Sequence, residues 1–124
     1  MSNKYVFIAG GIGATPFHAI LSELDRGVGM PDITFLYGAR TNQPTYSTEL
    51  AELDAKYPNL KLKYIVEPQR VNPAIIQENV ADIHTAFFYV SGPEPMVEAF
   101  DKMLKDMRID ESKIKKDYFP GYTW

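Results

Sequence analysis

In one-letter code, residues 4–16 read KYVFIAGGIGATP. The run Lys4–Ala9 is rich in β-branched and aromatic residues and is followed by a glycine pair, so it predicts a buried strand that ends in a sharp turn. Thr15 is then placed to cap a helix. Pro16 suits the first helical position because its ring presets φ and no amide donor is needed there. The stretch predicts a strand, a glycine turn and a helix, in that order.

The same alternation continues along the chain. Four more strands are predicted, over Ile33–Tyr37, Leu60–Val66, Ala86–Val90 and, at an edge, Ile114–Phe119. Four helices are predicted between or after the strands. The first ends near Gly27, and the second is indicated by Tyr46, Leu50, Leu53 and Tyr57. The third starts at Asn72-Pro73 and ends near Val80, and the apolar spacing of Met96–Met107 indicates the fourth. Alternating strands and helices predict an α/β fold, a three-layer doubly wound parallel sheet of five strands in the order 3-2-1-4-5. Such sheets bind ligands beyond the carboxyl ends of their strands, where the winding reverses.

Composition excludes several classes of function. The 124 residues, 45% of them hydrophobic, suffice for one core, so a single domain over residues 1–124 is expected. A net charge of -3 gives no basic footprint for nucleic acid. No apolar run approaches the roughly 20 residues of a membrane span, and a cytoplasmic location is expected. With no cysteine and two histidines, no metal site is expected.

Two glycine-containing turns fall at the predicted crevice, Gly10–Pro16 after the first strand and Ser91–Met96 after the fourth. Glycines let backbone amides approach a pyrophosphate, and the helix that follows adds unpaired N–H groups and a positive dipole end. Tight packing of a strand-to-helix turn is the alternative explanation. The first loop lacks the Lys-Ser/Thr pair of a P-loop. The second strand ends Tyr-Gly-Ala-Arg, without the acid that usually binds ribose, so Glu67 after the third strand is the available acid.

Four signatures in order resemble the NAD(P)-binding domain of the ferredoxin–NADP reductase superfamily, whose fold is Rossmann-like. They are Gly-Gly-x-Gly-x-Thr-Pro at Gly10–Pro16, Tyr-Gly-x-Arg at Tyr37–Arg40, a Cys-Gly-Pro turn that reads Ser-Gly-Pro at Ser91–Pro93, and an acid before Phe-x-Gly-Tyr at Asp117–Tyr122. The resemblance spans essentially the whole chain. It implies NAD(P)H bound for hydride transfer to FAD or FMN, and these cofactor-binding residues: Gly10, Gly11, Ile12, Gly13, Thr15, Pro16, Gly38, Arg40, Glu67, Arg70, Ser91, Gly92, Pro93 and Met96.

Coenzyme preference depends on the residues after the third strand. NADPH-preferring members of the superfamily carry Ser-Arg there, whereas this chain reads Glu67-Pro-Gln-Arg70. A carboxylate repels a 2′-phosphate and accepts ribose hydroxyls, so NADH is the expected coenzyme. Arg70 could still pair with a 2′-phosphate. Solvated surface positions remain the alternative for Glu67 and for Arg40.

The resemblance also implies residues close to the reacting groups. Ser91 stands where many relatives have cysteine and is expected to position the nicotinamide; a small residue closing a turn is the alternative. Asp117 matches an acid of a proton network near the flavin, or is an edge-strand charge facing water. Three aromatic residues are expected to face the flavin or its domain, or else to pack on their own domain: Phe119, Tyr122 and Trp124.

The expected function is therefore that of an oxidoreductase domain that presents NAD(P)H to a flavin. The first strand begins near Lys4, so the flavin-binding barrel is expected on another domain or subunit, and the chain alone is expected to be catalytically incomplete. An electron acceptor, protein or small molecule, is expected downstream. Two alternatives stay open, a free-standing NAD(H) sensor without redox activity and an interaction domain that binds no nucleotide.

Overall fold

The computed structural model describes residues 4–10, 14–27, 29–39, 47–66 and 69–119, and the structural statements below concern these residues. Strands and helices alternate along the chain. In order, they are β1 (Lys4–Gly10), α1 (Ala14–Arg26), β2 (Asp32–Ala39), α2 (Ser47–Lys56), β3 (Leu60–Val66), α3 (Pro73–Asn79), β4 (Ala86–Pro93), α4 (Glu94–Asp106), the short 3₁₀ helix η2 (Glu111–Lys113) and β5 (Ile114–Phe119).

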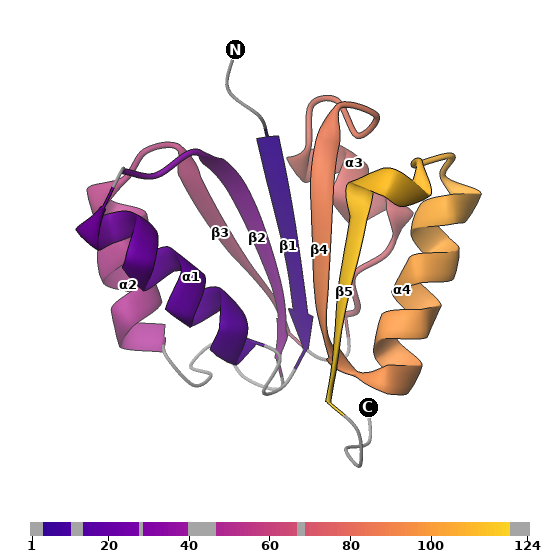
Figure 1. Cartoon of the computed structure of the whole chain (residues 1–124), viewed down its shortest axis with the longest axis horizontal. Helices are drawn as coiled ribbons and strands as arrows, with labels where there is room; N and C mark the ends of the chain where they lie inside the picture. Colours follow the sequence, from indigo (N-terminus) through magenta and orange to yellow (C-terminus); the bar gives the residue numbers. More distant parts are fainter. Residues whose placement is uncertain (1–3, 11–13, 28, 40–46, 67–68, 120–124) are drawn as a thin grey trace.

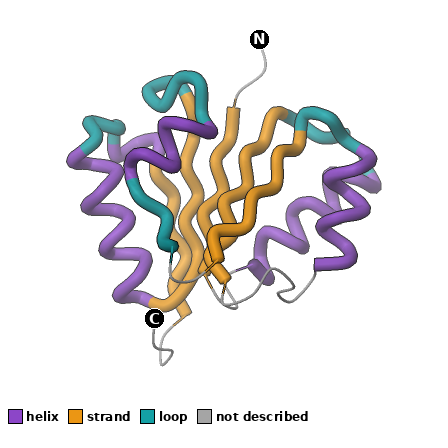
Figure 2. The backbone as a smooth tube through the Cα atoms, turned by 180° about the vertical axis from the view of Figure 1, so that it is seen from behind, coloured by secondary structure: helices purple, strands orange, loops and turns teal. Residues whose placement is uncertain are grey.

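The five strands form one sheet in the order β3-β2-β1-β4-β5, and every neighbouring pair is parallel. Helices α1 and α2 cover one face of the sheet, and α3 and α4 cover the other (Figure 1). The view from behind shows the same three layers (Figure 2). The predicted fold class and strand order are confirmed. The winding reverses between β1 and β4, so the carboxyl ends of these two strands lie side by side.

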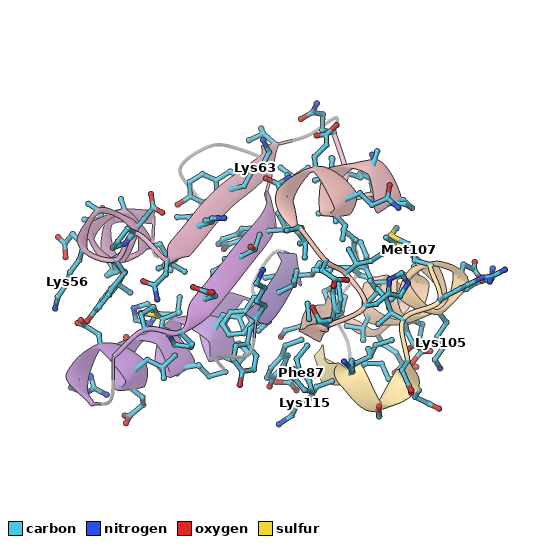
Figure 3. All side chains as sticks on the ribbon, turned by 90° about the horizontal axis from the view of Figure 1, so that it is seen from above. Lys56, Lys63, Phe87, Lys105, Met107 and Lys115 are labelled. Atoms are coloured by element: carbon cyan, nitrogen blue, oxygen red, sulfur yellow. The ribbon has the colours of Figure 1, made fainter. Side chains whose placement is uncertain are left out.

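Alternation along β1 divides the core in two. Val6 and Ile8 point to the face under α3 and α4, whereas Phe7 and Ala9 point to the face under α1 and α2. All four side chains are at most 5% exposed. Seen from above, side chains fill the space between the sheet and the helices on both faces (Figure 3). A strand buried on both faces needs such a continuous apolar run, and this is why the sequence signal for β1 is strong.

Aromatic packing fixes α1 over the centre of the sheet. Phe17, near the start of α1, stacks on Phe7 of β1 with ring centroids 4.5 Å apart. It also meets Phe35 of β2 and Tyr89 of β4 edge-on, at 5.2 and 4.9 Å. Such pairs contribute about 0.5–1.5 kcal/mol each beyond their buried area. They hold the first turn of α1 next to the carboxyl end of β1.

The predicted start of α1 was wrong by two residues. The helix begins at Ala14, so Thr15 and Pro16 are its second and third residues rather than its cap and first residue. Proline is still tolerated there, because the amides of the first helical turn have no partner within the helix. The predicted end near Gly27 is confirmed.

The predicted end of β4 at Val90 was also wrong. The strand continues through Ser91, Gly92 and Pro93, since β5 pairs with it residue by residue as far as Pro93 and Phe119. Proline is accepted at the last position of a strand. As a consequence the Ser-Gly-Pro segment belongs to the sheet, and α4 follows it directly at Glu94.

Candidate functional site

Three glycines lie next to one another at the carboxyl edge of the sheet. Gly38 of β2 pairs with Gly10 of β1. Ala9 pairs with Ser91, so Gly92 is the neighbour of Gly10 on the other side. All three face the α3 and α4 side, because they continue the alternation of Leu36, Ile8 and Val90. We call the row of Gly38, Gly10 and Gly92 the glycine shelf.

Met96 of α4 covers one part of the glycine shelf. A Cβ atom on Gly10 would lie 2.9 Å from the Met96 Cε and closer still to its Sδ, and one on Gly92 would lie 2.8 Å from the Sδ. Met96 is only 2% exposed. The end of the Met96 side chain occupies the space that a Cβ would need at positions 10 and 92, so a larger residue at either position would have to displace it.

The other part of the shelf is free of such contacts. A Cβ on Gly38 would meet just one atom of the described residues within 4 Å, the carbonyl oxygen of Ala9 at 3.6 Å. This is an ordinary van der Waals distance. Packing within the described part of the chain therefore does not explain why residue 38 is glycine.

The first turns of two helices lie beside the shelf, and their charges differ. Helix α1 has no acidic residue in its first turn, whereas α4 carries the exposed Glu94 there. Each first turn lacks one amide donor, at Pro16 in α1 and at Pro95 in α4, so the acidic residue is the difference between them. The positive end of a helix dipole favours an anion, and a carboxylate opposes one. The start of α1 is thus the better anion-binding end.

Ser91 presents a buried hydroxyl at this edge, on the opposite face from Met96. The residue has no exposed surface, and its Oγ has no hydrogen-bond partner among the described residues. A buried polar atom without a hydrogen-bond partner lowers stability by about 1–3 kcal/mol, so such an atom calls for an explanation other than stability. The described residues therefore leave the hydrogen-bonding capacity of this hydroxyl unused.

Tyr89 and Asp117 share the face of Ser91. Asp117 of β5 is the register partner of Ser91 and is half-buried. Tyr89 lies two residues before Ser91 on the same strand. Burial raises the pKa of the Tyr89 hydroxyl, and the negative charge of Asp117 raises it further. Tyr89 therefore stays protonated, and it keeps a donor near a carboxylate. The period of two along β4 could have identified Tyr89 from the sequence.

The structure brings several predicted site residues together and leaves others apart. Gly10, Gly38, Ser91, Gly92, Pro93 and Met96 meet at the carboxyl edge, where Pro16 lies in the first turn of α1. Arg70 is exposed and lies between β3 and α3. Only the backbone is described for Thr15, in α1, and for Phe119, in β5. The predicted residues outside the described ones are Gly11, Ile12, Gly13, Arg40, Glu67, Tyr122 and Trp124.

Other ionisable groups lie away from this edge. His18 is half-buried on α1, with its Nε2 4.0 Å from a carboxylate oxygen of Glu49. Within the residues whose placement is described, no group of three or more histidine, cysteine, aspartate or glutamate side chains is arranged to hold a metal ion. Across those same residues, no helix is long and apolar enough to cross a membrane.

Comparison with known proteins identifies the domain. Residues 7–102 match the family described as oxidoreductase NAD-binding domain. A protein of Neisseria meningitidis that is one subunit of the Na(+)-translocating NADH-quinone reductase is 30% identical over 134 residues, which cover 95% of this chain and 33% of that protein. A flavohemoprotein of Rhodopirellula baltica is 27% identical, and the match covers 96% of this chain and 33% of that protein. The chain spans about a third of the length of these curated relatives.

Solved structures share the fold. The flavohemoglobin of Malassezia yamatoensis superposes with a TM-score of 0.82 at 19% identity, covering 95% of this chain and 32% of that one. The cytochrome b5 reductase domain of Ulva prolifera nitrate reductase superposes with a TM-score of 0.79 at 21% identity, and the match covers 94% of this chain and 49% of that one. None of these comparisons favours the sensor without redox activity. The family match covers more than half of the chain, and the chain therefore belongs to the oxidoreductase NAD-binding domain family.

Proposed function

We propose that this chain binds NADH across the carboxyl ends of β2, β1 and β4 and presents its nicotinamide to FAD or FMN held by another domain or subunit. The observation that carries the proposal is the partnerless Ser91 hydroxyl, buried among the described residues beside the glycine shelf. When bound, the reduced nicotinamide supplies a hydride to the flavin. The protein has to bind and orient the coenzyme and to exclude water.

The diphosphate is assigned to the start of α1. Its first turn has free amides and no acidic side chain, and the loop from Gly10 to Ala14 contains three glycines. Gly11, Ile12 and Gly13, which the family motif places in this loop, belong to the same assignment. An anion held there gains the amide hydrogen bonds and the favourable dipole end.

Ser91 is assigned to the nicotinamide end. Its hydroxyl can both donate and accept a hydrogen bond, which suits a carboxamide group. Serine need not act as a nucleophile, because the hydride passes directly between cofactors. Asp117, its register partner, is proposed to belong to a proton network near the flavin. Phe119, Tyr122 and Trp124 are proposed to cover the flavin or its domain.

NADH is the proposed coenzyme because Glu67 follows β3 where a 2′-phosphate would need a cation. The exposed Arg70 is the one residue of this segment that favours NADPH. Dissociation constants for the two coenzymes, measured by quenching of their fluorescence, test the assignment. Tighter binding of NADPH would overturn it.

Titration of NADH into Gly13→Val tests the site itself. A valine in the loop blocks the close approach of backbone to diphosphate, so binding should be lost. Lys102→Ala, on the exposed side of α4, is the control and should bind NADH as the original chain does. Unchanged affinity in Gly13→Val would remove the diphosphate from this loop.

Turnover is proposed to need a flavin-binding domain or subunit and a downstream electron acceptor. Support comes from the relatives, which are about three times as long as this chain and include proteins named as a flavohemoprotein and an NADH-quinone reductase subunit. A cytoplasmic location is part of the same proposal. Efficient NADH oxidation with a dye acceptor by this chain alone, without a flavoprotein, would contradict the need for a partner.

A further inference from the structure

We propose that Met96 is a positioning residue that holds the carboxyl ends of β1 and β4 at a fixed separation, from inside the protein and without contacting the coenzyme. The proposal rests on the proposed function, since it concerns the geometry of that site. It gives Met96 a different role from the coenzyme contact that the sequence resemblance implies.

The first step is where the side chain lies. Met96 is the third residue of α4, and its Sδ and Cε occupy the space that a Cβ on Gly10 or on Gly92 would take. Gly10 ends β1 and leads into the loop before α1, whereas Gly92 lies in the segment that leads into α4. One side chain thus connects the ends of both strands with the start of α4.

The second step is burial. Met96 is 2% exposed and belongs to the core cluster under α3 and α4. Its side chain is therefore in contact with protein on nearly all sides. An unbranched thioether is narrow and adaptable, which suits a gap between two glycine backbones. Interiors are closely packed, so removing the side chain from this gap leaves the flanking strand ends without a neighbour between them.

The third step separates two reasons for glycine in the motif. At positions 10 and 92 the absent Cβ makes room for Met96, whereas at position 38 no side chain of the described residues takes that room. Gly10 and Gly92 leave room for the Met96 side chain between the ends of β1 and β4. Gly38 is then the shelf residue whose free space is left for the coenzyme.

Two truncations in the same helix provide the test. Met96→Ala removes most of the side chain that lies against Gly10 and Gly92. Leu104→Ala removes most of a fully buried side chain of the same core cluster, two turns further along α4. Both should lower the melting temperature. Only Met96→Ala should weaken NADH binding, by about tenfold or more, as expected if one hydrogen bond to a charged phosphate is lost. Met96→Leu, which refills the volume, should restore most of the affinity.

A double variant tests the contact directly. Gly10→Ala alone forces its new methyl group into Met96 and should weaken both folding and NADH binding. In Gly10→Ala with Met96→Ala the methyl group enters the vacated space, so the double variant should melt at a higher temperature and bind NADH more tightly than Gly10→Ala. If Met96→Ala is too unstable to assay, Met96→Val replaces it in both comparisons.

The outcomes are distinct. If the original chain binds no NADH, the proposed function fails. If it binds NADH and Met96→Ala affects the dissociation constant no more than Leu104→Ala does, the positioning role is overturned while the site stands. Strictly additive effects in the double variant would also overturn it.

Discussion

Ser91 and Asp117 are register partners in the parallel pairing of β4 and β5, so a buried hydroxyl without a partner among the described residues lies beside a half-buried carboxylate, at the edge where the coenzyme is proposed to bind. Met96 lies on the opposite face of the same strand end. One face of this strand end thus carries two polar side chains, and the other face packs on Met96.

Replacing Ser91 by alanine separates binding from folding. Removal of a buried hydroxyl without a partner should leave the melting temperature unchanged or raise it, since the group's desolvation cost of about 1–3 kcal/mol disappears. Affinity for NADH should fall, because the nicotinamide loses a hydrogen bond. Thermal unfolding with and without NADH measures both. A clear loss of stability without NADH would mean that the hydroxyl already has a partner.

Gly38→Ala should weaken binding without destabilising the fold. The new methyl group fits at 3.6 Å from the Ala9 carbonyl, and alanine restricts the unfolded chain, so the free energy of unfolding should rise by about 0.4–1 kcal/mol. NADH binding should weaken, because the methyl group occupies space left for the coenzyme. Urea unfolding and NADH titration of the same sample give the two values. Gly10→Ala is the matched comparison, and it should lose stability as well.

Asp101→Asn should loosen the attachment of β5 to α4. Asp101 is 7% exposed, and its Oδ2 lies 3.0 Å from Lys105 Nζ and 3.4 Å from Lys116 Nζ. The lysines are partly solvated, so the loss in unfolding free energy should be about 1–2 kcal/mol rather than the larger cost of a fully buried pair. Lys102→Gln breaks the exposed pair with Asp106 and serves as control, with less than about 0.5 kcal/mol expected. Equal losses in the two variants would contradict this interpretation.

Acid should remove the contribution of Asp25. Its Oδ1 accepts hydrogen bonds from Lys56 Nζ at 2.6 Å and from the Tyr57 hydroxyl at 2.5 Å, joining the end of α1 to the end of α2. The hydrogen bond from Lys56, followed by that from Tyr57, lowers the pKa of Asp25 below its ordinary value of 3.8. The stabilisation is complete above the ordinary value and is lost as the pH falls through the lowered one.

The stability difference between the original chain and Asp25→Asn should therefore be constant from about pH 7 to about pH 5 and should shrink towards about pH 3. Denaturant unfolding curves across this range measure it. A difference that grows on acidification would show that the pKa is raised in the folded state.

Local patterns predicted most of the fold. The bounds of β3 and β5 match the predicted Leu60–Val66 and Ile114–Phe119, and Asn72 caps α3 through a 2.9 Å hydrogen bond from the Ile75 amide. The end of β4 could not be predicted in this way, because it is set by pairing with β5, a strand far along the chain. A Gly-Pro pair read alone indicates a turn.

The candidate site was predictable in its location but not in its contacts. Glycines after two neighbouring strands indicated the edge. The apolar spacing of α4 assigned Met96 to a core-facing position, but it could not indicate that Met96 meets Gly10, because that contact depends on how two distant segments pack. The buried state of Ser91 depends on strands on both sides of β4.

Backbone amide NMR during an NADH titration tests the central claim most directly. The claim predicts that the largest shifts fall at the carboxyl edge, on Gly10, Ala14, Gly38, Ser91 and Gly92, with saturation at one equivalent. Shifts that gather instead at the amino ends of the strands, around Lys4, Asp32 and Lys61, would contradict it.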